Sequence, residues 1–315
     1  MWICTLILSL SLFSLLATGC GKSAQSASPV KRRMISSQTV SGIWTVENTT
    51  VNRTILLDHD GVTISVESFD PQGRDGPELE LLIQNDSDNI VTARAFGVSV
   101  NGYAITCDHR PRSGPNVAKG ETGRICVVFD SLDLELAGIR SFEEIELRLH
   151  TFDQDSGKVL FCSDPVKIET SAHEGADPGV SDSGDVIWSE KGVTISGLGF
   201  LDDGEKGGLL VEIVNHSGKG IEVHAGDASI DGEAYGCVFS SLIPDGKRAI
   251  RVLSFRESST QPPEDPDHYT LQLRLPDYRS VRTIKLSFTV MELDGDGWIT
   301  EKTLVQSGPV TIAFD

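Results

Sequence analysis

The feature that most constrains this chain is an internal repeat, because four short blocks of sequence occur twice in the same order. The blocks pair as residues 55–65 with 186–196, 78–85 with 208–215, 101–107 with 231–237, and 163–168 with 307–312. The first pair aligns without a gap around Gly-Val-Thr-Ile-Ser, and the second is ELELLIQN against GLLVEIVN. Such a repeat indicates one structural unit used twice. We therefore predict two homologous domains, at residues 51–170 and 186–315, joined by an acidic Gly/Ser/Asp linker at 171–185.

Within each unit the apolar residues recur with a period of two. Val62, Ile64 and Val66 alternate with polar residues, and the run from Ile284 to Val290 does the same in the second unit. This period is typical of half-buried antiparallel strands. A helical pattern is confined to a short stretch at 133–138. Seven or more short strands in each unit predict an all-β fold of two tandem immunoglobulin-like antiparallel β-sandwiches.

Two hairpins can be placed within this pattern. Asn101-Gly102 and Asp231-Gly232 each fall between two strand-like runs. A type I′ turn needs positive φ at both central residues, and Asn-Gly or Asp-Gly supplies it at low cost. We expect a tight hairpin at the same place in both units. The Cys…Trp…Cys pattern of antibody domains is missing, so only the architecture is predicted.

The N-terminus carries a leucine-rich run from Thr5 to Ala17, about thirteen residues long and interrupted by serines. A spanning helix needs roughly twenty apolar residues, so this length fits a signal-peptide core. Ala17-Thr18-Gly19 before Cys20 resembles the lipobox of bacterial lipoproteins, which implies cleavage before Cys20 and lipidation of its sulfur. The absence of Lys and Arg from residues 1–5 leaves plain secretion and a short signal anchor as alternatives.

Residues 1–19 are therefore predicted to be a signal peptide, and residues 20–50 a lipidated cysteine followed by a flexible tether. The tether is rich in Ser and Thr with few apolar residues, and as a random coil it would reach roughly 30 Å. The basic segment 22–33 lies where an anchored chain would meet anionic lipid headgroups, or is a solvated part of the tether. We expect a protein on the extracytoplasmic face of the cell membrane, with the membrane as a partner through the lipid on Cys20.

The chain resembles bacterial surface lipoproteins built of tandem immunoglobulin-like domains. The resemblance is carried by a G-V-x-I strand, an L-x-L-x-I-x-N strand and an Asn-Gly hairpin, and it covers most of residues 55–315. It implies the fold and a surface location, and it implies no catalytic residue.

Charge and cysteine content narrow the function further. The formal net charge of -19 repels phosphate backbones, so we predict no nucleic acid partner. Besides Cys4 and Cys20, the chain has four cysteines, none with CxxC spacing: Cys107, Cys126, Cys162 and Cys237. One disulfide within the first half and free buried thiols are both compatible with this arrangement.

Two acidic turns are the candidate metal sites. Asp153 and Asp155 in the first unit and Asp294 and Asp296 in the second occupy equivalent hairpins, and their spacing is similar to the start of a calcium loop. An EF-hand loop also needs a Glu at position twelve and flanking helices, which are missing. The four residues are thus a candidate weak calcium site, with simple turn chemistry as the alternative. No other metal site or cofactor is expected.

The common catalytic motifs are absent from the sequence, which has no HExxH, no G-x-S-x-G, no P-loop and no G-x-G-x-x-G. We therefore predict a protein that is not an enzyme and that has an adhesion, scaffolding or ligand-binding role, with an unknown protein or glycan ligand held at a loop cluster. The alternative is a carbohydrate-acting or metal-dependent enzyme, or an accessory module, that uses the acidic loops.

Overall fold

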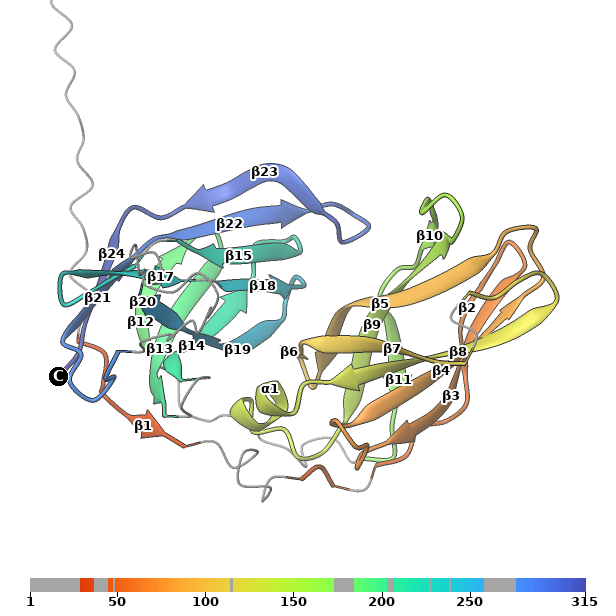
Figure 1. Ribbon diagram of the computed structural model, residues 1–315, viewed down its shortest axis with the longest axis horizontal. Coiled ribbons are helices and arrows are strands. Elements are labelled where there is room, and N and C mark those ends of the chain that lie inside the picture. The colour runs from red at the N-terminus through yellow and green to blue at the C-terminus, as the bar shows by residue number, and fades with distance from the viewer. Residues whose placement is uncertain are drawn as a thin grey trace, which may run out of the picture.

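The computed structural model describes residues 29–36, 45–172 (except 48, 114 and 115), 184–257 (except 203–206, 227 and 238) and 276–315. The regular secondary structure of the described residues is almost all β-strand, and their one α-helix is α1 (Ser131–Leu136). They form two β-sandwiches that lie side by side (Figure 1). The prediction of an all-β sandwich fold is confirmed. The predicted signal peptide, Cys20 and most of the linker lie outside the described residues, so these assignments and the domain boundaries stay predictions.

The first sandwich has two facing sheets. One has the order β2-β3-β4-β8-β7, with bounds β2 (Ile55–His59), β3 (Val62–Asp70), β4 (Glu78–Asn85), β8 (Glu121–Phe129) and β7 (Cys107–Ser113). The other contains β6 (Tyr103–Ala104), β5 (Val91–Val100) and β9 (Glu144–Asp153), and β9 also pairs with β10 (Val159–Cys162) and β11 (Val166–Glu169). When β2 and β6 are left out, the two sheets together have the strand order of a constant-type immunoglobulin domain.

The second sandwich follows this plan, but one strand is moved and one face is divided between a four-stranded and a five-stranded sheet. Its strands are β12 (Asp185–Glu190), β13 (Val193–Leu201), β14 (Gly208–Asn215), β15 (Ile221–Ala225), β16 (Ala228–Ile230), β17 (Glu233–Cys237), β18 (Phe239–Ile243), β19 (Arg248–Leu253), β20 (Phe255–Glu257), β21 (Thr283–Leu286), β22 (Phe288–Leu293), β23 (Ile299–Gln306) and β24 (Val310–Ala313). Strand β18 pairs with β15, whereas its counterpart β7 in the first sandwich pairs with β8. One edge of β19 is therefore not covered by β18.

The two predicted hairpins are present. Asn101 and Gly102 have φ of 49° and 82°, and Asp231 and Gly232 have φ of 50° and 96°. Both central residues of each turn thus lie in the left-handed region that a type I′ turn requires. The two repeats thus have the same turn at the same place, as expected if one structural unit is used twice.

The sandwiches are joined by a shared sheet and a shared apolar contact. Strand β6 pairs in parallel with the free edge of β19, at Tyr103 and Arg248, so that strands of both sandwiches form one ten-stranded sheet. Leu210 and Ile250 lie on the outer face of the second sandwich's β13-β14-β19 sheet, and both are buried in the core cluster of the first sandwich. This apolar contact holds the two sandwiches against each other.

Part of the predicted tether is built into the fold. Strand β1 (Met34–Ile35) pairs in parallel with β13, so residues 29–36 lie along the second sandwich and do not form a free random coil. Residues 45–47 and 49–51 then lie on the first sandwich, where Val51 forms a bridge with Thr170. The prediction of a random-coil tether is therefore wrong for these residues.

Candidate interdomain binding cleft

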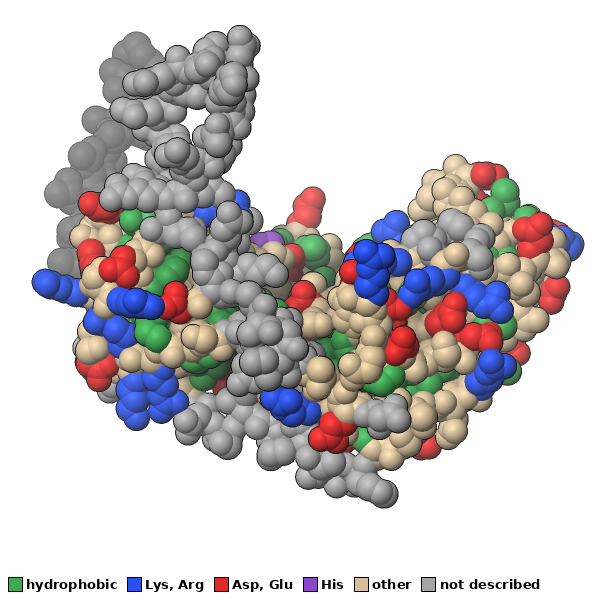
Figure 2. Space-filling view, turned by 60° about the horizontal axis from the view of Figure 1, so that its bottom comes forward, with side chains coloured by type: hydrophobic (Ala, Val, Ile, Leu, Met, Phe, Trp, Pro, Cys, Tyr) green, Lys and Arg blue, Asp and Glu red, His purple; other side chains and the backbone are tan. Residues whose placement is uncertain are grey.

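A cavity of about 570 Å³ lies between the two sandwiches, and we call it the interdomain cleft. Its lining residues come from both sandwiches: Phe96, Gly97, Glu146, Arg148, Pro165, Gly218–Gly220, Leu242–Asp245, Glu292–Gly295, Gly297, Thr300 and Lys302. Figure 2 shows the notch between the two sandwiches from one side. Sites for small ligands are concave and typically enclose about 300–1,000 Å³, so the cleft has the size of such a site.

The wall from the first sandwich depends on a β-bulge in β5. The pairing of β5 with β9 shifts register between Phe96 and Ser99, and Gly97 has a φ of 56° in this bulge. A Cβ at Gly97 would lie 3.4 Å from Cγ of Pro244, so the second sandwich approaches the bulge closely. Phe96 stacks on buried His150, with ring centroids 4.2 Å apart, which fixes the orientation of its ring.

The wall from the second sandwich is held by Asn215, whose side chain is fully buried. Its Nδ2 donates hydrogen bonds to the carbonyl oxygens of Lys219 (2.8 Å), Ile243 (3.0 Å) and Pro244 (3.1 Å). Its Oδ1 accepts from the backbone N–H and the hydroxyl of Ser217, at 3.0 and 2.8 Å. Because Lys219, Ile243 and Pro244 all line the cleft, Asn215 positions two of its loops.

One carboxylate at the cleft is shared by two lysines. Glu292 is 7% exposed, and its Oε2 lies 2.7 Å from Nζ of Lys219 and 3.0 Å from Nζ of Lys302. The hydrogen bonds from Lys219 and Lys302 hold the pKa of Glu292 below its ordinary value. Glu292 is therefore ionised at neutral pH, and the three side chains present fixed polar contacts beside Leu242 and Pro244.

The turn at Asp294–Gly297 connects the two sandwiches at the rim of the cleft. Nη1 of Arg148 donates to the carbonyl oxygen of Gly295 at 2.9 Å. Trp298 lies between Phe96, His150 and Phe152, with centroid distances of 5.1, 5.1 and 6.1 Å. Burial lowers the pKa of His150, so its ring is neutral at pH 7. This hairpin of the second sandwich thus packs on β9 of the first.

The four candidate calcium ligands occupy two separate turns. Oδ1 of Asp153 accepts from the N–H groups of Asp155 and Ser156. Oδ1 of Asp294 accepts from the N–H groups of Asp296 and Trp298. These are the contacts expected of turn chemistry. Within the part of the chain that the structure describes, no three His, Cys, Asp or Glu side chains form a group that could hold a metal ion.

A buried ion pair fixes the contact between the sandwiches next to the cleft. Nη1 of Arg251 in β19 lies 3.0 Å from Oδ2 of Asp133 in α1, and each side chain is 11% exposed. Arg251 also donates to the carbonyl oxygen of Ala104 at 3.0 Å and, through Nε, to Oγ of Ser241 at 3.2 Å. Burial raises the pKa of Asp133, and Arg251 partly opposes this shift. A cavity of about 340 Å³ adjoins this pair and shares Phe96, Gly97 and Leu242 with the cleft.

Of the two arrangements left open for the cysteines, the structure has free thiols at Cys107, Cys126, Cys162 and Cys237. Burial raises the pKa of Cys126 to about 11 and that of Cys237 to about 12. Burial also raises the pKa of Cys107 well above its ordinary value. Since the thiolate is the reactive form, these thiols are poor nucleophiles at neutral pH.

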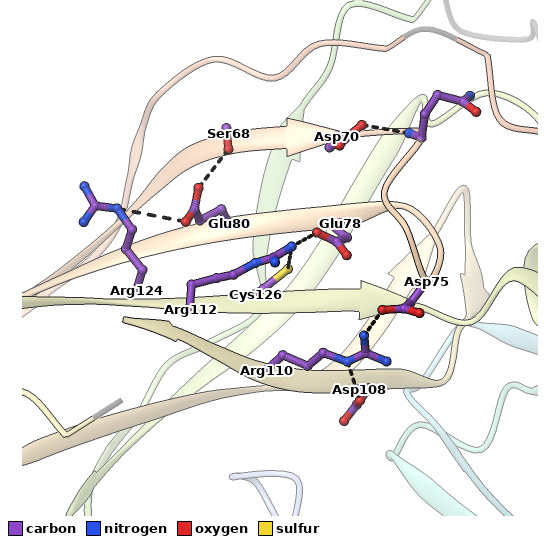
Figure 3. A network of polar contacts seen from close by, with 11 residues as sticks. Ser68, Asp70, Asp75, Glu78, Glu80, Asp108, Arg110, Arg112, Arg124 and Cys126 are labelled. Atoms are coloured by element: carbon purple, nitrogen blue, oxygen red, sulfur yellow. Dashed lines mark hydrogen bonds and ion pairs between the residues drawn. The ribbon is translucent and has the colours of Figure 1, made fainter. Parts of the chain in front are cut away.

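A second polar cluster lies on the outer face of the first sandwich, on strands β3, β4, β8 and β7 (Figure 3). Its charged groups pair with one another: Arg112 with Glu78, Arg110 with Asp75 and Asp108, and Arg124 with Glu80, which also accepts from Ser68. Such pairs on a half-exposed sheet face contribute little to stability. The cluster is largely a solvated sheet face, and at its edge Asp75 also lines a cavity of about 390 Å³.

Sequence reasoning missed the residues that build the cleft, although the repeat contains their signal. Asn85 in the first sandwich makes the same contacts as Asn215, with Nδ2 donating to Asn89 and Val117 and Oδ1 accepting from Ser87. The shared Asn at the end of both strand blocks therefore indicated a buried turn anchor. The apolar run GLLVEIV, where the first repeat alternates as ELELLIQ, indicated a strand of the second unit buried on both faces.

No family model and no curated protein sequence matches this chain. Among solved structures, it is similar to the conserved domain protein from Bacillus anthracis, with 10% identity over 84% of this chain and 91% of that chain and a TM-score of 0.25. It is also similar to the YadV chaperone, with 9% identity over 73% of this chain and 92% of that chain and a TM-score of 0.20. At these TM-scores neither similarity bears on function. No helix in the described part of the chain is long and apolar enough to cross a membrane.

Proposed function

We propose that this protein is a lipid-anchored, extracytoplasmic binding protein that holds its ligand in the interdomain cleft. The observation that carries the proposal is the cleft itself, a cavity of about 570 Å³ lined by both sandwiches. Phe96, Leu242 and Pro244 give it apolar walls, and the group of Glu292 and its two lysines gives it fixed polar contacts. A concave apolar site with a few oriented polar groups is the usual form of a site for a small ligand.

The chemistry of the walls indicates an amphipathic ligand, such as a glycan ring or a peptide side chain. One face of the ligand would pack on Phe96 and Leu242, and its hydroxyl, amide or charged groups would bind Lys219, Lys302 and Glu292. Both sandwiches contribute to the site, and the interdomain contacts of Arg251 and Trp298 hold the walls at a fixed separation. A preformed site loses little conformational freedom when the ligand binds.

The ligand class can be identified by screening residues 21–315 on glycan and peptide arrays. We expect the variants Phe96→Ala and Lys219→Gln to weaken binding of the best hit by about tenfold or more, which corresponds to roughly 1.4 kcal/mol. Phe161→Ala is the matched control, because Phe161 stacks on His59 and does not line the cleft. Unchanged affinity in both cleft variants, measured by calorimetry, would place the ligand elsewhere and refute the cleft assignment.

The anchor is tested by Cys20→Ala, which removes the sulfur that would carry the lipid. We expect this variant to move from the membrane fraction to the soluble fraction and to lose incorporation of labelled fatty acid, because the acyl chains supply the membrane affinity. Cys162→Ala serves as the control and should stay in the membrane fraction. Membrane retention of Cys20→Ala without labelled lipid would mean that another segment anchors the protein.

A further inference from the structure

Residues 29–36, which we call the N-terminal strap, are bound to the second sandwich along their length. Val30 is 1% exposed and belongs to the core of that sandwich, and its N–H donates to the carbonyl oxygen of Ala313 at 2.8 Å. Met34 and Ile35 pair with Phe200 and Leu201 in β13. The strap therefore has both a buried side chain and a strand pairing, as a bound peptide has in β-strand addition.

Polar contacts bind the strap to residues from both ends of the second sandwich's sequence. The guanidinium of Arg32 donates to the carbonyl oxygens of Val281 (2.6 Å) and Arg279 (3.1 Å). The backbone N–H of Lys31 donates to Asp185 at 3.1 Å, and that of Arg32 donates to Asp315 at 3.2 Å. The strap is thus bound by residues from the start and from the end of the second sandwich.

The second sandwich is shaped for the strap in a way that the first is not. Gly197 and Gly199 stand where the first repeat has Val66 and Ser68. A Cβ at Gly199 would lie 2.5 Å from the carbonyl oxygen of Arg33, and one at Gly197 would lie 2.9 Å from Cγ1 of Val30. Real Cβ atoms essentially never approach to 2.5 Å, so the two glycines make room for the strap. The two glycines, at which the second repeat differs from the first, therefore lie where the strap packs on β13.

We infer that the second sandwich carries a strand-docking site on β13, that its occupant is the chain's own residues 29–36, and that this docking places the second sandwich beside the membrane. The inference rests on the proposed anchor at Cys20. Nine residue steps separate Cys20 from Pro29, and a fully extended chain spans at most about 3.6 Å per residue. Pro29 is then within roughly 30 Å of the lipid. Although the first sandwich comes first in the sequence, it is the membrane-distal one.

The arrangement of the strands agrees with this orientation. Val30 forms a parallel bridge with Phe314, so the strap enters beside the C-terminal strand β24. Figure 1 shows β24 at the end of the second sandwich that is remote from the first sandwich, and β1 runs from there toward the first sandwich, whose core cluster Ile35 contacts. The far end of the first sandwich is consequently directed away from the membrane.

The test is energy transfer to a labelled lipid, measured on the full lipidated chain in phosphatidylglycerol-containing vesicles. A donor probe is placed at Gly308, which has open space around it, or at Asp88, whose side chain is 91% exposed on the first sandwich. We expect at least twofold higher transfer from position 308 than from position 88. Equal transfer, or higher transfer from position 88, in vesicle-bound protein would overturn the inference and leave the anchor intact.

Two strap variants and a control complete the experiment. Val30→Asp puts a charge into the core and should release the strap, so that the difference between positions 308 and 88 is lost. Gly199→Ser, which introduces the residue of the first repeat, should have the same effect, because its Cβ would clash with Arg33 and because serine rarely adopts the φ of 136° found at Gly199. Met34→Asp is the control, because Met34 is 37% exposed and the difference should persist. If the difference in energy transfer between positions 308 and 88 persisted in both strap variants, another contact would set the orientation. If the protein never bound the vesicles, both the anchor and this inference would be refuted.

Discussion

Replacing Asn215 by alanine should lower the free energy of unfolding by about 3 kcal/mol or more, because each buried polar group left without a partner costs roughly 1–3 kcal/mol. The fully buried side chain satisfies three backbone carbonyl groups and accepts from Ser217. The alanine methyl group replaces none of these bonds. Urea denaturation followed by far-UV circular dichroism measures the change.

The same substitution should also disturb the interdomain cleft, since Asn215 holds the loops that contain Lys219 and Pro244. The repeat offers a matched control in Asn85→Ala. Asn85 is 1% exposed and has the same type of contacts, but it lies in the first sandwich and away from the cleft. We expect both variants to be destabilised to a similar extent and only Asn215→Ala to lose ligand affinity. Equal loss of affinity in both would mean that general destabilisation, and not loop position, weakens binding.

The local parts of the fold could be predicted from the sequence because they depend on neighbouring residues. The alternation of Val62, Ile64 and Val66 identified strands, and the turns at Asn101-Gly102 and Asp231-Gly232 follow from positive φ at two adjacent positions. The partner of a strand depends on the whole sheet. The repeat therefore gave no sign that β18 pairs with β15 while β7 pairs with β8.

The cleft could not be predicted from motifs, because no short motif builds it. Phe96 reaches it through a bulge, and Pro244 and Lys219 reach it through loops that Asn215 ties together. The strap was missed for a similar reason. Its strand has only two residues, and the chain around it is polar, so its composition resembles that of a tether. The only local indication of the strap in the sequence was the pair of glycines at 197 and 199. Their role is recognisable only in the structure, where the carbonyl oxygen of Arg33 lies close to Gly199.

One sequence difference between the repeats lies at the contact between the two sandwiches, and it makes a second strong prediction. Leu210 is 3% exposed and packs with the first sandwich, whereas the equivalent residue of the first repeat is Glu80, on a half-exposed charged face. Leu210→Glu therefore gives the second sandwich the residue of the first. Burying an uncompensated carboxylate costs several kcal/mol, so we expect a loss of about 3–5 kcal/mol in the interaction of the two sandwiches.

The measurements for Leu210→Glu are small-angle X-ray scattering, which should show a larger radius of gyration, and urea denaturation, which should show two transitions in place of one. The reverse change, Glu80→Leu, is the control. Glu80 accepts from Ser68 and lies 4.0 Å from Arg124, and such exposed pairs contribute roughly 0–1 kcal/mol. Stability and scattering should therefore stay close to those of the unmodified protein. If Leu210→Glu left both measurements unchanged, the β6–β19 pairing and the ion pairs Arg251–Asp133 and Lys247–Glu146 would hold the sandwiches together without Leu210.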